Sequence, residues 1–161
     1  MYEAFSDIVF NKTNKKFMII SHYNPDGDTC GSALALYEAL INIGKEVDVF
    51  CSSDFNKKLS FIPNFEVYNK KHLSSYDVAI AVDCADDKRL GDYSQEFYKT
   101  KTTICIDHHG TNPKFAQLNY VKPEAAATCE FLYDIIKEMD NIQKCFDTKV
   151  AKALYCGIIT R

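Results

Sequence analysis

Short apolar runs alternate along the chain with longer stretches that are rich in helix-forming residues. Such apolar runs are typical of strands that are buried on both faces of a parallel sheet. The pattern predicts strands at 17–20, 46–51, 76–83, 102–107 and, at an edge, 117–121. It predicts helices at 2–10, 31–44, 54–61, 92–99, 124–139 and 148–159. Strands separated by helices indicate βαβ units, so we expect one α/β domain: a Rossmann-like parallel sheet flanked by helices on both faces.

The helix predicted at 31–44 follows a turn-rich loop with the sequence NPDGD at 24–28. We expect it to begin at Gly31 and to end at Gly44, because glycine is common just past a helix C-terminus. The free N–H groups and partial positive charge of a helix start favour a bound phosphate. Gly31 is therefore a candidate for substrate contact, together with Asn24 in the loop.

Acidic and histidine side chains cluster directly after three of the predicted strands. Parallel strands end at the same edge of a sheet, which is where ligands bind in open α/β folds. We therefore expect one shared site, built from His22, Asp26, Asp28, Asp83, Asp107, His108 and His109. Asp86 and Asp87 follow the third strand as well, and we expect them to cap a helix or to lie on the surface.

This cluster contains no lysine or arginine, so its carboxylates would repel one another in a partly buried site. Divalent cations are the obvious compensation. A sulfur-free set of nitrogen and oxygen ligands favours Mn²⁺, with Fe²⁺, Co²⁺ or Mg²⁺ as alternatives, over structural zinc. The number of ligands suits two cations, which at ~3.5–4 Å apart activate a water and stabilise both oxygens of a phosphoryl displacement.

Composition and charge restrict the kinds of binding partner that we expect for this chain. The net charge is −3, from 19 basic and 22 acidic residues, so the chain lacks the basic excess that long duplex nucleic acid requires. No apolar stretch is long enough to span a membrane. The seven cysteines form no CxxC motif, which argues against zinc and disulfide frameworks and favours a reducing, cytoplasmic location.

Three motifs carry a resemblance to a known family. They are HYNPDGDTCGS at 22–32, VDCAD at 82–86 and DHHGTN at 107–112. In order, spacing and strand-end context they resemble the DHH phosphoesterases, and the likeness covers nearly the whole chain. The run from 107 through 119–121 to 127–130 is most similar to the oligoribonuclease/pAp-phosphatase branch. That branch includes enzymes that hydrolyse very short RNAs, adenosine bisphosphate (pAp) or dinucleotides.

The resemblance implies a ligand set for two cations, Mn²⁺ being preferred. His22, Asp26 and Asp83 would hold the first cation. Asp28, Asp83 and His108 would hold the second, so that Asp83 bridges the two.

Two further residues of the DHH motif receive catalytic roles from the same resemblance. His109 would contact or protonate the scissile phosphate, and Asp107 would orient a neighbouring histidine through a hydrogen bond.

The chain departs from the family pattern near its end. A fourth family motif supplies another aspartate, but here GIIT at 157–160 leads to Arg161, whose guanidinium cannot bind a metal. The resemblance then implies a weaker second cation, and Arg161 becomes a candidate for contact with a substrate phosphate. The family also has a smaller C-terminal substrate-binding domain. We expect residues 1–161 to be the catalytic domain without it.

The expected function is hydrolysis of a small nucleotide or short single-stranded RNA by a metal-activated water. The sequence is compatible with assembly of the chain into an oligomer. Two alternatives stay open. One is a degenerate metal- or nucleotide-binding module with little turnover, which Arg161 and the missing domain favour. The other is an inorganic pyrophosphatase, an activity that the same family contains.

Overall fold

The computed structural model describes residues 1–70, 73–139 and 141–160. A five-stranded sheet in the order β2-β1-β3-β4-β5 forms its centre, and every pair of neighbouring strands is parallel. The strands are β1 (Lys16–Ser21), β2 (Glu46–Phe50), β3 (Val78–Val82), β4 (Thr102–Asp107) and β5 (Leu118–Val121). The predicted parallel α/β fold is confirmed, including the short strand β5 at one edge.

The strand order places a crevice where the site residues were expected. From β1 the chain passes to β2 on one side, and it then returns so that β3 pairs with the other side of β1, Phe17 opposite Val78. Ligands bind in open α/β sheets at such a switch point, outside the carboxyl ends of the strands. His22 directly follows β1 and Asp83 directly follows β3.

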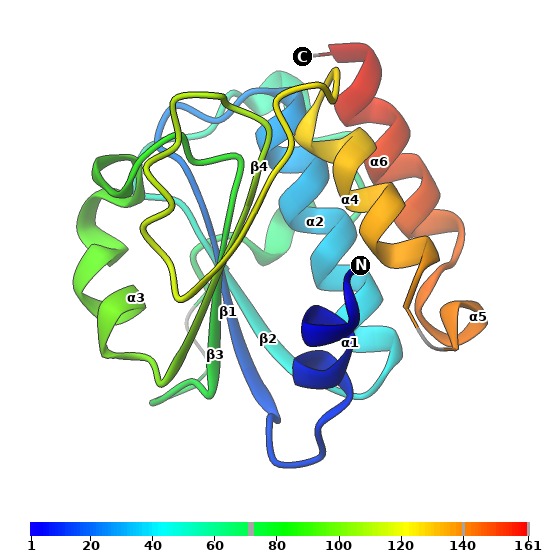
Figure 1. Cartoon of the computed structure of the whole chain (residues 1–161). Helices are drawn as coiled ribbons and strands as arrows, with labels where there is room; N and C mark the ends of the chain where they lie inside the picture. The colour runs from blue at the N-terminus through cyan, green and yellow to red at the C-terminus, as the bar shows by residue number, and fades with distance from the viewer. Residues whose placement is uncertain (71–72, 140, 161) are drawn as a thin grey trace.

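Helices cover both faces of the sheet, with α2, α4 and α6 on one side and α3 on the other (Figure 1). The α-helices are α1 (Glu3–Phe10), α2 (Gly27–Asn42), α3 (Ser94–Lys99), α4 (Thr128–Lys137), α5 (Ile142–Cys145) and α6 (Thr148–Thr160). Three 3₁₀ segments join them: η1 (Lys57–Leu59), η2 (Phe65–Val67) and η3 (Asp87–Tyr93).

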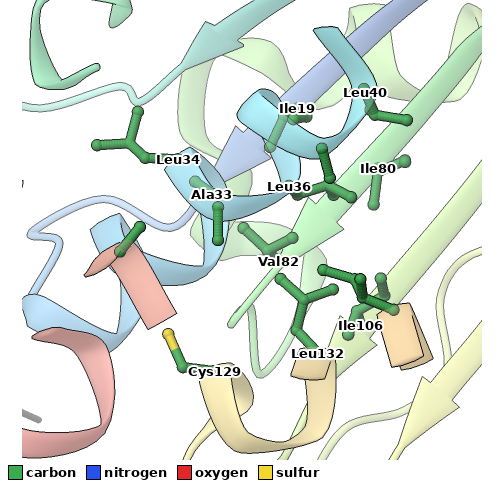
Figure 2. Close-up of a cluster of buried hydrophobic side chains, with 14 of the residues drawn as sticks. Ile19, Ala33, Leu34, Leu36, Leu40, Ile80, Val82, Ile106, Cys129 and Leu132 are labelled. Carbon is green, nitrogen blue, oxygen red and sulfur yellow. The ribbon is translucent and has the colours of Figure 1, made fainter. Parts of the chain in front are cut away.

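The two faces of the sheet build two cores of unequal size. Alternate residues of a strand point to opposite faces, so Ile19 joins the larger core and Met18 the smaller one. In the larger core, apolar side chains of α2 and α4, such as Leu36 and Leu132, pack against the strands (Figure 2). The smaller core lies under η3 and α3 and includes Phe97. The larger core therefore anchors the helices α2 and α4, whose first turns reach the site.

Helices α2 and α6 approach each other closely because glycine stands where they meet. A β-carbon on Gly31 would lie 2.6 Å from the carbonyl oxygen of Ala153 and 3.0 Å from the α-carbon of Gly157. No side chain fits into that space without moving one of the helices. Gly31 thus sets the distance between α2 and α6.

Some predicted element bounds are wrong. The helix predicted at 54–61 is replaced by loop and the single 3₁₀ segment η1. Helix α2 begins at Gly27, four residues before the predicted Gly31, because the Asp26 side chain accepts a hydrogen bond from the N–H of Thr29 and caps the helix there. Helix α4 is shorter than the predicted 124–139.

In the part of the chain that the structure describes, no helix combines the length and apolar character that crossing a membrane requires. All seven cysteines are free thiols, and all except Cys156 are buried.

Candidate metal centre

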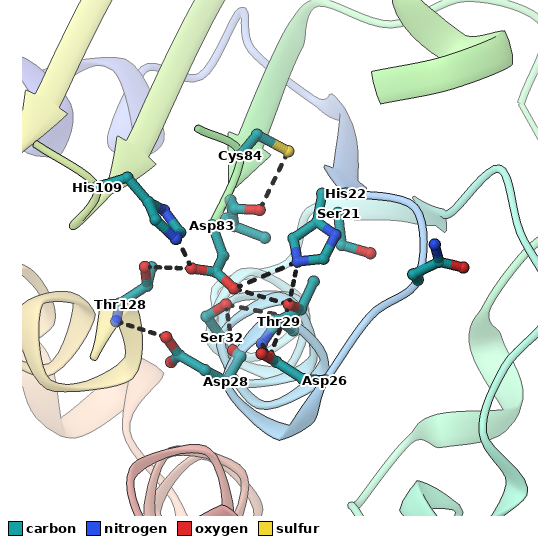
Figure 3. A network of polar contacts seen from close by, with 12 residues as sticks. Ser21, His22, Asp26, Asp28, Thr29, Ser32, Asp83, Cys84, His109 and Thr128 are labelled. Atoms are coloured by element: carbon teal, nitrogen blue, oxygen red, sulfur yellow. Dashed lines mark hydrogen bonds and ion pairs between the residues drawn. The ribbon is translucent and has the colours of Figure 1, made fainter. Parts of the chain in front are cut away.

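The acidic and histidine side chains predicted to form one site meet at the carboxyl edge of the sheet. Figure 3 shows His22, Asp26, Asp28, Asp83 and His109 there. They come from the segments after β1, β3 and β4 and from the first turn of α2. Helix α4 also points its first turn at them. The site is thus built by five elements that are distant in sequence and share one edge of the sheet.

Asp83 lies at the centre of this arrangement and is only 2% exposed. Its backbone has a left-handed φ of 56°, and its N–H donates to the carbonyl of Ile106 on the neighbouring strand. Hydroxyl groups engage both carboxylate oxygens: Thr29 Oγ1 lies 2.7 Å from Oδ2, and Thr128 Oγ1 lies 2.9 Å from Oδ1. The two threonines fix the orientation of the carboxylate.

Burial raises the pKa of the Asp83 carboxyl to about 7, and the nearby charge of Asp28 adds to the effect. The hydrogen bonds from Thr29 and Thr128 act in the opposite direction, but they do not restore the ordinary pKa. Among the described residues, the ion-pair partners of Asp83 are histidines rather than lysine or arginine. A cation at this point would favour the ionised carboxylate, so the donor set fits a metal ion.

The first group that could hold a metal ion consists of His22, Asp26 and Asp83, with one ligand atom from each lying within 4.8 Å of the others. The Nδ1 of His22 contacts the carbonyl oxygen of Tyr23. Because a carbonyl only accepts hydrogen bonds, Nδ1 carries a proton, and Nε2 keeps a lone pair when the ring is neutral. That Nε2 lies 3.9 Å from Asp83 Oδ2. A neutral His22 therefore presents the nitrogen that a metal requires.

The second group consists of Asp83, His108 and His109, again within 4.8 Å of one another. His108 Nε2 lies 3.8 Å from Asp83 Oδ1 and 3.6 Å from Asp28 Oδ2, so it stands between two carboxylates. Its other nitrogen lies 3.2 Å from the carbonyl oxygen of Ala125. Such a contact fixes the ring and leaves Nε2 directed at the carboxylates.

His109 is arranged for proton transfer rather than for ligation through Nδ1. That atom lies 2.7 Å from Oδ1 of Asp107, a fully buried carboxylate whose Oδ2 accepts from the amide of Asn112 at 2.8 Å. Burial by itself lowers the pKa of His109, but the hydrogen bond and charge of Asp107 outweigh it, so the net pKa is raised. The side chain is 41% exposed, which leaves the ring accessible to a substrate.

Asp28 has a structural role that sequence reasoning missed. Its Oδ2 accepts from the N–H of Thr128 and its Oδ1 from the N–H of Cys129, both at 2.9 Å. The residue before α4, Ala127, provides no side-chain cap, so Asp28 caps this helix from a distance of 100 residues. Each carboxylate oxygen keeps a second lone pair, so the cap does not prevent Asp28 from facing a cation beside His108.

A comparison with known proteins assigns this arrangement to a family. A family model described as "DHH family, N-terminal domain" matches residues 16–158. The chain belongs to the DHH family. The resemblance seen in the three motifs is confirmed.

The DHH chain is 35% identical over 144 residues to the bifunctional oligoribonuclease and PAP phosphatase NrnA of Thermus thermophilus, which covers 88% of this chain and 42% of that protein. It is 26% identical over 140 residues to the Bacillus subtilis protein of the same name, covering 86% and 43%. A crystal structure of an exopolyphosphatase-related protein from Bacteroides fragilis matches with a TM-score of 0.88 at 25% identity, over 98% of this chain and 48% of that one. The chain thus spans less than half the length of each of these proteins.

The three predicted substrate contacts lie in different places. Asn24 is exposed, its N–H donates to Ser53 Oγ at 2.7 Å, and it lines an open, polar cavity of about 640 Å³ together with Asp92 and Tyr93. Gly31 was predicted at a helix start, but it lies in the second turn of α2, where it is buried against α6. Arg161 lies outside the described residues.

Asp86 and Asp87 stay apart from the ligand groups. The Asp86 side chain accepts from the N–H of Arg89 and caps η3, which confirms the capping prediction. Asp87 accepts from the hydroxyl of Tyr98 at 2.7 Å. Neither belongs to a metal-binding group among the described residues.

Sequence reasoning missed Thr29, Thr128 and Asn112, which hold Asp83 and Asp107. Thr29 directly follows the second aspartate of the first motif, and Thr128 opens a helix near the site, so both had a positional signal. A hydroxyl in such a position is easily assigned to a helix end, and only the folded chain shows which carboxylate it contacts.

Proposed function

We propose that this DHH chain is the catalytic domain of a phosphoesterase that depends on divalent cations and hydrolyses short nucleotide substrates. The observation that carries the proposal is the position of Asp83. This buried carboxylate belongs to both ligand groups and has a raised pKa, and histidines surround it. A residue of that kind is suited to bridge two cations. The names of the two NrnA relatives support the choice of nucleotide substrates.

In this proposal the first cation is held by His22, Asp26 and Asp83, and the second by Asp28, Asp83 and His108. Cations bound there supply a water of lowered pKa as the nucleophile and neutralise charge on the phosphoryl oxygens. The mixed nitrogen and oxygen donors favour Mn²⁺, with Mg²⁺, Co²⁺ and Fe²⁺ as alternatives.

The remaining residues of the site orient these ligands and move a proton. Asp107 fixes the Nδ1 proton of His109, so the opposite nitrogen is the one that meets the substrate. A protonated His109 donates to the leaving oxygen as the phosphorus–oxygen bond breaks, and its raised pKa keeps that proton available near neutral pH. Thr128 and Cys129 of α4 hold Asp28 in place by hydrogen bonds from their backbone N–H groups.

The charge of the chain favours a small substrate. Asn24 lies two residues from the ligand Asp26 in the sequence, but the cavity of about 640 Å³ that Asn24 lines includes none of the candidate metal ligands, so its volume does not set the size of the substrate. The net charge of −3 agrees with a short ligand whose phosphates are neutralised by bound cations instead of by a basic surface.

The proposal is tested in three incubations of the chain, each with Mn²⁺ present. The substrate is pAp in the first, a diadenosine dinucleotide in the second and pyrophosphate in the third. We expect release of phosphate from pAp or of mononucleotide from the dinucleotide, and abolition of both by a chelator. Asp86→Ala serves as the matched acidic control, because Asp86 lies outside both ligand groups.

Two other outcomes would overturn the proposal and identify the alternative. Nucleotide binding without turnover at any cation concentration would indicate a binding module. Cleavage of pyrophosphate with both nucleotides left intact would indicate a pyrophosphatase.

A further inference from the structure

The hydroxyl of Thr29 occupies an unusual position in the first ligand group. Thr29 is fully buried in the first turn of α2. Its Oγ1 lies 2.9 Å from His22 Nε2, 2.9 Å from Asp26 Oδ1 and 2.7 Å from Asp83 Oδ2. These three partners form the first ligand group (Figure 3). A protein hydroxyl therefore stands among all three residues of a candidate metal site.

The hydrogen bonds at this point cannot all form at once. A hydroxyl has one proton to donate. Asp26 and Asp83 are acceptors, and His22 Nε2 is an acceptor too, because the contact with the Tyr23 carbonyl places the ring proton on Nδ1. The hydroxyl can donate to only one of the three at a time, although Asp26 Oδ1 also accepts from the backbone N–H of Thr29 at 2.9 Å. The position is better suited to a cation than to a hydroxyl.

The space among the three ligand atoms also sets the Thr29 hydroxyl against a metal ion. The ligand atoms lie within 4.8 Å of one another, and Oγ1 is close to equally distant from all three. Metal–ligand bonds of about 2.0–2.2 Å are shorter than these hydrogen bonds, so an ion that bound all three atoms from the side of Thr29 would overlap the region that Oγ1 fills. The hydroxyl and the ion cannot both occupy it.

We propose that Thr29 is a positioning residue that fills the first ligand group in the metal-free chain, and that a cation binds there only by displacing its hydroxyl. The inference rests on the proposed function, since it concerns the same metal site. In the metal-free chain the hydroxyl holds His22, Asp26 and Asp83 together. Its displacement costs part of the binding free energy of the incoming ion, so Thr29 weakens the affinity of this group for metal.

The cost of displacement depends on the β-branch of threonine. The side chain has to turn about its first torsion, and a β-branched residue in a helix has few allowed positions there. Serine carries the same hydroxyl without the methyl group, so it turns away more easily. Alanine leaves the region open to the ion. The affinity of the first group for metal should therefore rise from Thr29 to serine to alanine.

Thr128 provides a matched control in the same site. Its hydroxyl also bonds to Asp83, on Oδ1 at 2.9 Å, and the residue is equally buried. Among the described residues, Thr128 makes no hydrogen bond to His22 or Asp26, so its removal opens no space among the three ligand atoms. Both threonines stabilise Asp83, but only Thr29 competes with the ion.

The test is a Mn²⁺ titration of the 161-residue chain in which free Mn²⁺ is followed by its electron paramagnetic resonance signal. We expect Thr29→Ala to bind about tenfold more tightly than the wild type, since a hydrogen bond to a charged group is lost on displacement. Thr29→Ser should be intermediate, and Thr128→Ala should show no gain in affinity. Without metal, Thr29→Ala should melt at a lower temperature than the wild type. A purely structural role for Thr29 would not combine lower metal-free stability with tighter binding.

A double-mutant cycle with His22→Ala locates the effect. Because His22→Ala removes one ligand of the first group, adding Thr29→Ala should then leave Mn²⁺ affinity unchanged. Equal or weaker Mn²⁺ binding by Thr29→Ala, or a gain that persists without His22, overturns this inference while the proposed function stands. If neither the wild type nor Thr29→Ala binds Mn²⁺, the proposed function and this inference are both wrong.

Discussion

The two ligand groups of the site share Asp83 but are built differently around it. In the first group, the hydroxyl of Thr29 lies among His22, Asp26 and Asp83 at 2.7–2.9 Å from each. In the second, a histidine that is 41% exposed, His109, has its proton fixed by a buried carboxylate behind it. The hydroxyl of Thr29 thus fills the first group, whereas the second group places a partly exposed histidine, His109, towards solvent.

Under the proposed function, this difference separates two tasks of a phosphoesterase. In the first group, the hydroxyl of Thr29 holds the three ligand residues in place before an ion arrives, and its displacement lowers the affinity for that ion. A half-exposed histidine with a raised pKa is suited to meeting a substrate and moving a proton. Asp83 couples the two tasks because one of its oxygens faces each group.

The largest effect should come from the residue that the groups share. Asp83→Asn keeps the shape of the side chain but removes the charge that both groups need. We expect Mn²⁺ affinity and hydrolysis to fall by at least on the order of 100-fold, the upper range seen when residues that only support a metal ligand are changed. Metal content and turnover are the measurements, with circular dichroism to check folding. An Asp83→Asn chain that hydrolyses nucleotides at the wild-type rate would rule out the bridging role.

A smaller effect, confined to the second group, is expected from Asp107→Asn. This change removes the charge that raises the pKa of His109, so the pKa should fall. If protonated His109 is the acid, the alkaline limb of the pH–rate profile then moves to lower pH, and turnover falls by about 10- to 100-fold at neutral pH. Mn²⁺ affinity of the first group should be retained. An unshifted profile would contradict the assignment of His109.

The pH dependence of stability should report Asp83 directly in the metal-free chain. Folding raises its pKa from 3.8 to about 7, so the folded chain binds more protons than the unfolded chain between these values. The contribution of Asp83 to the free energy of unfolding should therefore be greatest at low pH and fall by about 3 kcal/mol as pH rises from 4 to 7, whereas carboxyls with a lowered pKa, such as Asp77 and Asp134, act in the opposite direction. The raised pKa of His109 acts in the same direction. Urea denaturation with a chelator measures this slope, which Asp83→Asn should flatten.

The smallest effect is expected at an acidic residue that belongs to neither group. Asp86 caps η3 through the N–H of Arg89, so Asp86→Ala should cost about 1 kcal/mol of stability. Mn²⁺ affinity and turnover should equal those of the wild type. A loss of metal binding in Asp86→Ala would show that the site extends beyond the two groups described.

Residues at strand ends could be predicted to meet because the geometry of a parallel sheet is strict. His22, Asp83 and His108 each follow a buried strand, and parallel strands bring their carboxyl ends to one edge. The resemblance to the DHH family then predicted which of these residues would hold each of the two cations. Gly31 shows the limit of that reasoning, because the cap formed by Asp26 starts the helix four residues earlier than its composition suggested.

Side-chain contacts between distant elements were beyond prediction from the pattern. Thr29 and Thr128 contact Asp83 across 54 and 45 residues, and Asp28 caps α4 across 100. A threonine or aspartate at the start of a helix has a local partner as its usual choice, and nothing in the pattern indicates a remote one. The packing of α2 against α6 and α4 decides which remote groups come within reach.

The amino-acid order alone determined that this chain forms a parallel α/β sheet and that its imidazoles and carboxylates gather at one edge. Those features follow from periodic burial and from the direction of parallel strands, both of which are local or repetitive properties. Tertiary structure alone decided that a threonine hydroxyl stands among the ligand atoms of His22, Asp26 and Asp83. That outcome depends on how far α2 inserts beside β1 and β3, a distance set by the packing of whole helices and by no short stretch of sequence.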